Sequence, residues 1–308
     1  MTAWRSRPLQ EALGSRHIER RGRYAIAVLK KLLDVEPHPS SRLPEAVTLL
    51  ERVNEIPAVL DRADGALLDR LSDAQRTIWD FFTIAYAADL RRERPGRLFP
   101  KQKVILALGG ASIEAADTNH LHRNTQFELY VAAMLALGGA AVRFGEPDIL
   151  IQVGSQECGV AAKRLVSLSQ AKLEERMLDA AGQIARTGKH GYVAVNIDSH
   201  YRGSSLSSDE VVRQELFTEK TSRPLEIIRR KLGAMSHVEG ALVYGYSSSW
   251  DTSKRPPHHS TSVPVSYQLI GGDNDRTTRP LVHSFWEGYI ARLHNQLDYM
   301  RSVTFQGV

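Results

Sequence analysis

The chain has 308 residues, 42% hydrophobic and 24% charged, which suits a globular protein with a full core, and it has no apolar run near the ~18 to 20 residues that span a bilayer. A formal net charge of +5 permits a polyanionic partner such as nucleic acid without defining one. The chain has one cysteine, Cys158, which excludes an internal disulfide framework and a cysteine-based zinc site. Residues 1–23 lack the apolar segment of a secretory signal. We therefore expect a cytoplasmic protein with no membrane contact.

Residues 9–90 are predicted to be mainly helical. Apolar residues recur at helical spacing through residues 18–33, and two closely spaced prolines end that pattern. Two further helices are predicted, at Pro44–Val53 and at Ala66–Leu90, the first with a proline in its first turn. No catalytic motif occurs here, so we interpret this region as a helical part that packs, docks or positions a substrate.

A basic run follows the helical region. It contains Arg91, Arg92, Arg94, Arg97, Lys101 and Lys103, opposed only by Glu93. Such a run is either a solvated linker or a segment that tracks phosphates, and both interpretations stay open. Pro95-Gly96 and Pro100 mark the expected boundary between a helical N-terminal region, 1–100, and an α/β domain with a C-terminal extension, 101–308.

The middle of the chain predicts an α/β fold. The predicted elements are a helix at Thr125–Leu137, strands at Ala140–Phe144, Asp148–Val153 and Gly159–Leu165, a helix at Ser169–Thr187 and a strand at Tyr192–Ile197. The order α-β-β-β-α-β favours a mixed central sheet with flanking helices, preceded by the helical N-terminal region.

The C-terminal part extends this pattern. We expect helices at Ser208–Phe217, Leu225–Leu232 and Leu281–Met300, strands at Ala241–Tyr246 and Val265–Ile270, and a polar loop at Ser247–Ser262. These elements are predicted to enlarge the sheet.

Asp148 and Lys163 are the candidate chemical groups. Asp148 opens one predicted strand and Lys163 lies on the next, so hairpin pairing brings them together at one end. Carboxylates are ligands that Mg²⁺ prefers, and a nearby lysine can stabilise charge on a phosphate or orient a water. Taken singly, Asp148 also fits ordinary turn chemistry, and Lys163 fits an edge lysine that discourages strand pairing.

The pattern resembles the PD-(D/E)xK, or restriction-endonuclease-like, nuclease superfamily over residues 124–198. The matching parts are Pro147-Asp148, Val160-Ala161-Ala162-Lys163-Arg164, the helix ending Ala180-Ala181-Gly182-Gln183-Ile184, and Tyr192-Val193-Ala194-Val195. The resemblance implies a nuclease that uses Mg²⁺ or Mn²⁺, with DNA as the expected substrate. The superfamily usually carries an acid two places before its lysine, where this sequence has Ala161.

The resemblance also suggests which residues complete the site. Members often supply an acid from the preceding helix, here Glu128, and some supply one from the following helix, here Glu174. Glu174 falls within the apolar sector of its predicted helix, where a carboxylate needs a paired cation. Taken singly, Glu128 also fits an acid that complements its helix N-terminus. The predicted metal ligands are therefore Glu128, Asp148, Glu174 and the carbonyl of Ala162.

Arg164 and Gln183 are expected to contact nucleic acid, since Gln183 resembles a helix glutamine of several nuclease branches. The first hypothesis is thus a nuclease whose catalytic residues are Glu128, Asp148, Lys163 and Glu174. A homodimer would suit the cleavage of both DNA strands. The second is a nuclease-like fold that binds nucleic acid or protein without cutting, with Ala161 marking the lost activity. The third is a structural or interaction protein.

Overall fold

The structure, a computed structural model, describes most of the chain. The described residues are 5–62, 65–91, 95–153, 155–166, 169–198, 223–245, 247–251, 258–269, 288–289 and 291–292. The predicted helix at Ser208–Phe217 lies outside these ranges, and so does nearly all of the one predicted at Leu281–Met300.

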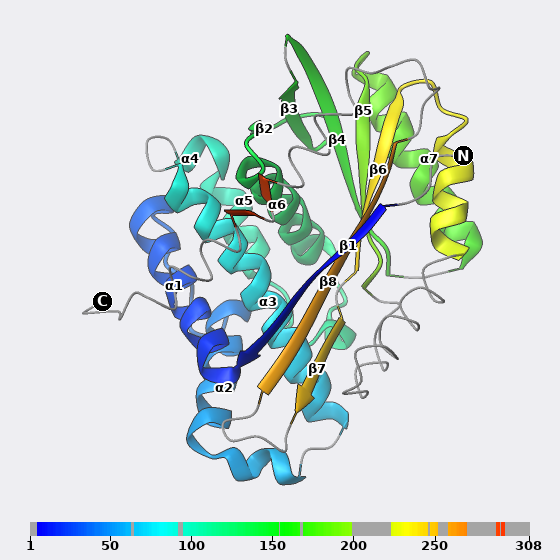
Figure 1. The fold of residues 1–308 in the computed structure, drawn as a ribbon. Coiled ribbons are helices and arrows are strands. Elements are labelled where there is room, and N and C mark those ends of the chain that lie inside the picture. The colour runs from blue at the N-terminus through cyan, green and yellow to red at the C-terminus, as the bar shows by residue number, and fades with distance from the viewer. Residues whose placement is uncertain are drawn as a thin grey trace.

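One mixed sheet organises the described residues (Figure 1). Its strands are β1 Arg5–Gly14, β2 Ala141–Phe144, β3 Ile149–Val153, β4 Gln156–Arg164, β5 Gly191–Asn196, β6 Val238–Tyr244, β7 Ser247–Asp251 and β8 His258–Leu269. Their order is β1-β8-β6-β5-β4-β3-β2, and β7 also pairs with β8. Strand β5 lies between β4 and β6 and runs parallel to both. All the other strand pairs are antiparallel.

Helices flank this sheet. They are α1 Ser15–Leu33, α2 Arg42–Glu55, α3 Gly65–Leu90, α4 Pro95–Leu98, α5 Lys101–Leu108, α6 Leu121–Leu137 and α7 Gln170–Arg186, with short 3₁₀ turns η1 Pro57–Arg62 and η2 Glu114–Ala116 and a helix at 223–232. The predicted order α-β-β-β-α-β is confirmed as α6-β2-β3-β4-α7-β5. Among the described residues, none of these helices is long and apolar enough to cross a membrane.

Two sequence predictions of local structure are wrong. Residues 9–14, expected in a helix, belong to β1, which pairs with β8 in the register Leu9↔Val263. The predicted loop Ser247–Ser262 instead contains β7 and the first part of β8, in the register Trp250↔His259. Strands β1 and β7 both form by pairing with β8. This pairing is a tertiary contact, which local sequence patterns do not predict.

Different helices pack against the two faces of the sheet. Along β4 and β5, Val160, Tyr192 and Ala194 lie in the core with α6 and α3, whereas Ala161 and Val193 lie in the core with α7. Successive side chains of a strand point to opposite faces, which explains this division. Figure 1 shows α7 and the helix at 223–232 on one side of the sheet and α3 and α6 on the other.

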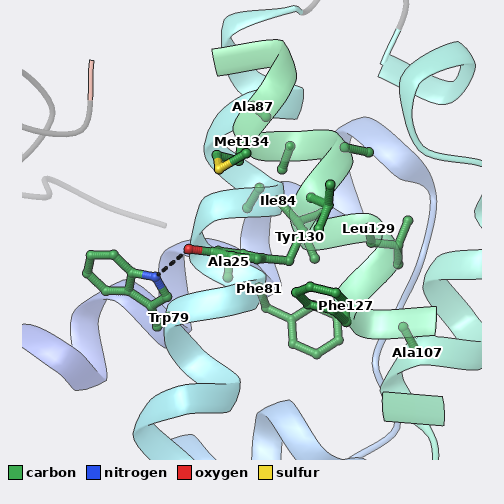
Figure 2. Close-up of a cluster of buried hydrophobic side chains, with 14 of the residues drawn as sticks. Ala25, Trp79, Phe81, Ile84, Ala87, Ala107, Phe127, Leu129, Tyr130 and Met134 are labelled. Carbon is green, nitrogen blue, oxygen red and sulfur yellow. Dashed lines mark hydrogen bonds between the residues drawn. The ribbon is translucent and has the colours of Figure 1, made fainter. Parts of the chain in front are cut away.

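The larger core joins the N-terminal helices to the sheet. Figure 2 shows its centre, where the indole Nε1 of Trp79 on α3 donates a 3.3 Å hydrogen bond to the hydroxyl of Tyr130 on α6. Phe81 of α3 and Phe127 of α6 are buried in the same cluster. Hydrophobic packing is therefore continuous across residue 100, and the division into 1–100 and 101–308 stays a prediction about domain organisation.

Candidate functional site

Asp148 and Lys163 meet at the rim of the sheet where β3 begins and β4 ends. The antiparallel register pairs Ile149 with Val160, which places Asp148 beside the last residues of β4. The Oδ2 atom of Asp148 accepts a 2.8 Å hydrogen bond from the amide of Ala162 and lies 3.8 Å from the Nζ atom of Lys163. The structure therefore brings together the acid and the lysine that the sequence singled out.

Asp148 is a mostly buried carboxyl. Burial raises its pKa from the ordinary 3.8 to about 6, against the opposing effects of the Lys163 charge and the Ala162 hydrogen bond. The negative charge of Glu128 raises this pKa further, and the positive charge of Lys103 lowers it. The carboxyl is thus placed where a cation would favour its ionised form.

Glu128 approaches the same rim from α6. Its Oε2 atom lies 2.5 Å from the Nζ atom of Lys103, which comes from α5, and its side chain is 18% exposed. Lys103 also lies over the ring of Phe144 in β2, with Nζ 5.0 Å from the ring centroid. Two carboxylates at the rim therefore each have a lysine beside them.

Lys163 is held from the α7 side. Its Nζ atom donates a hydrogen bond to the Oε1 atom of Gln183, and its side chain is 15% exposed. Gln183 thus positions the lysine that faces Asp148. We call Asp148, Glu128, Lys163, Lys103 and Gln183 the rim cluster.

The carbonyl of Ala162 faces this cluster. The Gly159 amide donates to the carbonyl of His190, just before β5, and the amide of Leu165, just after β4, donates to Asn196 of β5. The residues between them alternate, so Ala162 directs its backbone groups toward β3. The N–H and C=O of one strand residue point to the same side, and the Ala162 amide already bonds to Asp148. The carbonyl is therefore directed to the side from which Asp148 approaches.

Glu174 is not brought to the rim. Its carboxylate contacts the Nζ of Lys231 at 2.7 Å and the Nη2 of Arg230 at 2.8 Å, and Gln170 donates to it at 2.9 Å. Hydrogen bonds from Lys231 and Gln170 lower its pKa. Gln183 lies nine residues further along α7, roughly 13 Å of helix rise. The cation that this carboxylate was expected to need is supplied by the helix at 223–232.

Ala161 occupies a packed position. Its side chain is fully buried in the core beneath α7, near Leu173 and Met177. The site where the superfamily usually carries an acid is therefore filled by apolar packing in this chain. Across the described ranges, no group of three or more His, Cys, Asp or Glu side chains is arranged to hold a metal ion.

Arg164 lies on the face opposite Lys163. Its side chain is only 4% exposed and forms an ion pair with Glu114 of η2. The expected contact between Arg164 and a nucleic acid does not follow from this placement, because its guanidinium is turned into the protein. Gln183, the other residue expected at nucleic acid, is engaged with Lys163.

A layer of buried ion pairs adjoins Arg164, and the sequence reasoning missed it. Arg76 of α3 pairs with Asp198 and lies 3.7 Å from Asp80, and other members include Arg123 and Asp117 at 3.1 Å. One feature of the sequence could have indicated this layer. Asp80 is a charged residue in an apolar stretch, between Ile78 and Phe81, on a buried helix. Lys103 was expected only as part of the basic run, and its contact with Glu128 is visible only in the folded structure.

The donor set suits a hard divalent cation in part. Asp148, Glu128 and the Ala162 carbonyl offer oxygen atoms, and Mg²⁺ is commonly bound by one or two carboxylates with several waters. Comparison of the chain with protein-family models, with curated proteins and with solved structures finds no match.

Proposed function

We propose that the chain is a divalent-metal-dependent nuclease that hydrolyses phosphodiester bonds, with DNA as its substrate. The observation that supports this most is the contact of Asp148 with both the Lys163 ammonium, at 3.8 Å, and the Ala162 amide, at 2.8 Å. Asp148, Glu128 and the Ala162 carbonyl are the groups that would hold Mg²⁺ or Mn²⁺. The surplus of basic residues in the whole chain is compatible with a polyanionic substrate.

In phosphodiester hydrolysis, a water oxygen bonds to phosphorus and releases a proton to solvent. The bond from phosphorus to one sugar oxygen breaks, and that oxygen takes a proton from solvent. When held by Asp148, Glu128 and the Ala162 carbonyl, a divalent cation would supply an activated water and would neutralise charge on the phosphate. Lys163 stabilises the negative charge that develops on the phosphate oxygens. Gln183 keeps the lysine ammonium at that place through its hydrogen bond.

A second candidate is a nuclease-like fold that binds nucleic acid, or a protein partner, without cutting. Two observations favour it: Ala161 is buried in apolar packing, and Glu174 is bound by Lys231 and Arg230. The site then has two carboxylates instead of the three that the sequence suggested. This candidate predicts salt-sensitive binding of nucleic acid without metal-dependent hydrolysis.

The test is incubation of the whole protein with end-labelled double-stranded DNA and, separately, RNA, in Mg²⁺, in Mn²⁺ and in a chelator. Our proposal predicts DNA cleavage that requires the metal and is lost in Asp148→Asn. The matched control is Asp179→Asn, an exposed acid of α7, which should cleave like the wild type. Cleavage of RNA alone would contradict the proposed substrate, and retained DNA binding without cleavage would favour the second candidate.

A further inference from the structure

The Lys103–Glu128 pair lies at a carboxylate that the proposed function assigns to a metal. The ammonium is 2.5 Å from the Glu128 Oε2 atom, and the two side chains are 36% and 18% exposed. The ammonium takes one of the two oxygens of the Glu128 carboxylate and brings a positive charge to the group that a divalent cation would use. Because like charges at one carboxylate repel each other, binding of the metal and contact with the lysine oppose each other.

The surroundings of Lys103 support such an exchange. The ammonium also lies 5.0 Å from the Phe144 ring centroid, a distance at which an aromatic face attracts a cation. The ring offers a second partner that requires no carboxylate. The Lys103 charge also acts on Asp148, so this one lysine influences both candidate acids.

We propose that Lys103 is an internal competitor for the divalent cation, holding Glu128 when the metal is absent and yielding it when the metal binds. The inference rests on the proposed metal site at Glu128 and Asp148, and it assigns to Lys103 a role that sets metal affinity. If Lys103 competes with the metal, removing its charge strengthens metal binding. Removing a residue that merely supports the site would instead weaken metal binding.

The chain contains a matched control for this pair. Lys101, on the same helix, contacts the Asp34 Oδ2 atom at the same distance of 2.5 Å, but the Asp34 side chain is 95% exposed and lies in no candidate site. Lys101→Met and Lys103→Met therefore remove the same charge from the same helix. Only the second removes it from beside Glu128.

The experiment is calorimetric titration of Mn²⁺ into the full-length protein without nucleic acid, with folding checked by circular dichroism. Lys103→Met should raise Mn²⁺ affinity about fivefold, the factor expected for loss of an ion pair worth ~1 kcal/mol. Lys103→Arg, which keeps the charge, should stay within about twofold of wild type, like Lys101→Met. Glu128→Gln should weaken Mn²⁺ binding in both the wild-type and the Lys103→Met background.

Unchanged or weaker Mn²⁺ binding in folded Lys103→Met would overturn the inference, as would Mn²⁺ binding that ignores Glu128→Gln, or no binding in any variant. The readout is independent of cleavage. A protein that shows the expected change in affinity but cuts no DNA supports the role of Lys103 and contradicts only the proposed nuclease activity.

Discussion

The Asp148 carboxylate accepts a 2.8 Å hydrogen bond from the Ala162 amide, which ties the acid before β3 to the strand that carries Lys163. This bond fixes the separation of the two candidate catalytic groups through the backbone of β4. The rim cluster is consequently supported by the sheet and by three helices, α5, α6 and α7, an arrangement that holds reacting groups more precisely than loops do.

The first prediction concerns the titration of Asp148. Its folded-state pKa of about 6 lies above the ordinary 3.8, so the folded protein binds this proton more tightly than the unfolded chain. The stability associated with the protonated carboxyl is present below about pH 4 and is lost as pH rises to about 6. At 1.4 kcal/mol per pKa unit, the loss is about 2 to 3 kcal/mol.

Asp148→Asn should therefore raise the free energy of unfolding at pH 7.5 by roughly this amount and remove that part of the pH dependence. Urea denaturation of wild type and variant between pH 4 and 7.5, without divalent metal, measures the difference. Asp179→Asn serves as the exposed control. Parallel stability curves for wild type and Asp148→Asn would contradict the raised pKa.

The second prediction concerns Gln183 as a positioning residue. Gln183→Met removes the acceptor for the Lys163 ammonium while keeping similar bulk. We expect the single-turnover cleavage rate to fall roughly tenfold, since a lysine that is less well placed stabilises the phosphate less effectively. Mn²⁺ affinity should stay unchanged, because Gln183 is not among the proposed ligands.

The control for this change is Gln170→Met, which alters a glutamine of the same helix that contacts Glu174 instead. A loss of Mn²⁺ affinity in Gln183→Met equal to its loss of rate would point to a metal-site role and contradict pure positioning.

The third prediction tests whether the missing acid can be restored. Ala161→Asp places a carboxylate in a fully buried position beneath α7. We expect the free energy of unfolding to fall by about 3 kcal/mol or more, because burial of an unpaired charge is costly. Thermal unfolding with and without Mn²⁺ measures the effect, with Ala161→Ser as a smaller polar change. A large Mn²⁺-dependent stabilisation confined to Ala161→Asp would show that this position reaches the metal site.

The fourth prediction assigns Arg164 a structural role. Arg164→Met should lower the free energy of unfolding by about 3 kcal/mol, since it leaves the buried Glu114 carboxylate without its ion-pair partner. The double variant Arg164→Met, Glu114→Met should recover much of that loss, because both charges are then removed. Urea denaturation gives the three free energies. If the Arg164→Met variant kept wild-type stability but bound DNA far less tightly, the structural role would be contradicted and a role of Arg164 in DNA binding would be supported.

The sequence predicted the parts of the site that depend on local pairing. Asp148 directly precedes β3 and Lys163 lies on β4, its partner in the antiparallel pair, so their meeting required only the register of these two strands. The order α6-β2-β3-β4-α7-β5 was likewise readable from hydrophobic periodicity and glycine positions. These features are carried by residues close together along the chain.

The features that were missed depend on distant segments. Glu174 was expected to bind a metal, whereas its carboxylate pairs with Lys231 of the helix at 223–232, and no local pattern indicates that packing. Lys103 faces Glu128 only because α5 packs beside α6. The strand β1 forms because β8, some 250 residues later, pairs with it.

The central claim is tested most directly by the metal-dependent cleavage rate of Lys163→Met, measured under single turnover with double-stranded DNA and saturating Mn²⁺. The control is Lys172→Met, an exposed lysine of α7 paired with Glu175. We predict a fall of about a hundredfold or more for Lys163→Met, in line with removal of an electrostatic stabiliser, and none for Lys172→Met. Equal rates for wild type and Lys163→Met, or metal-dependent cleavage absent from the wild type, would contradict the account.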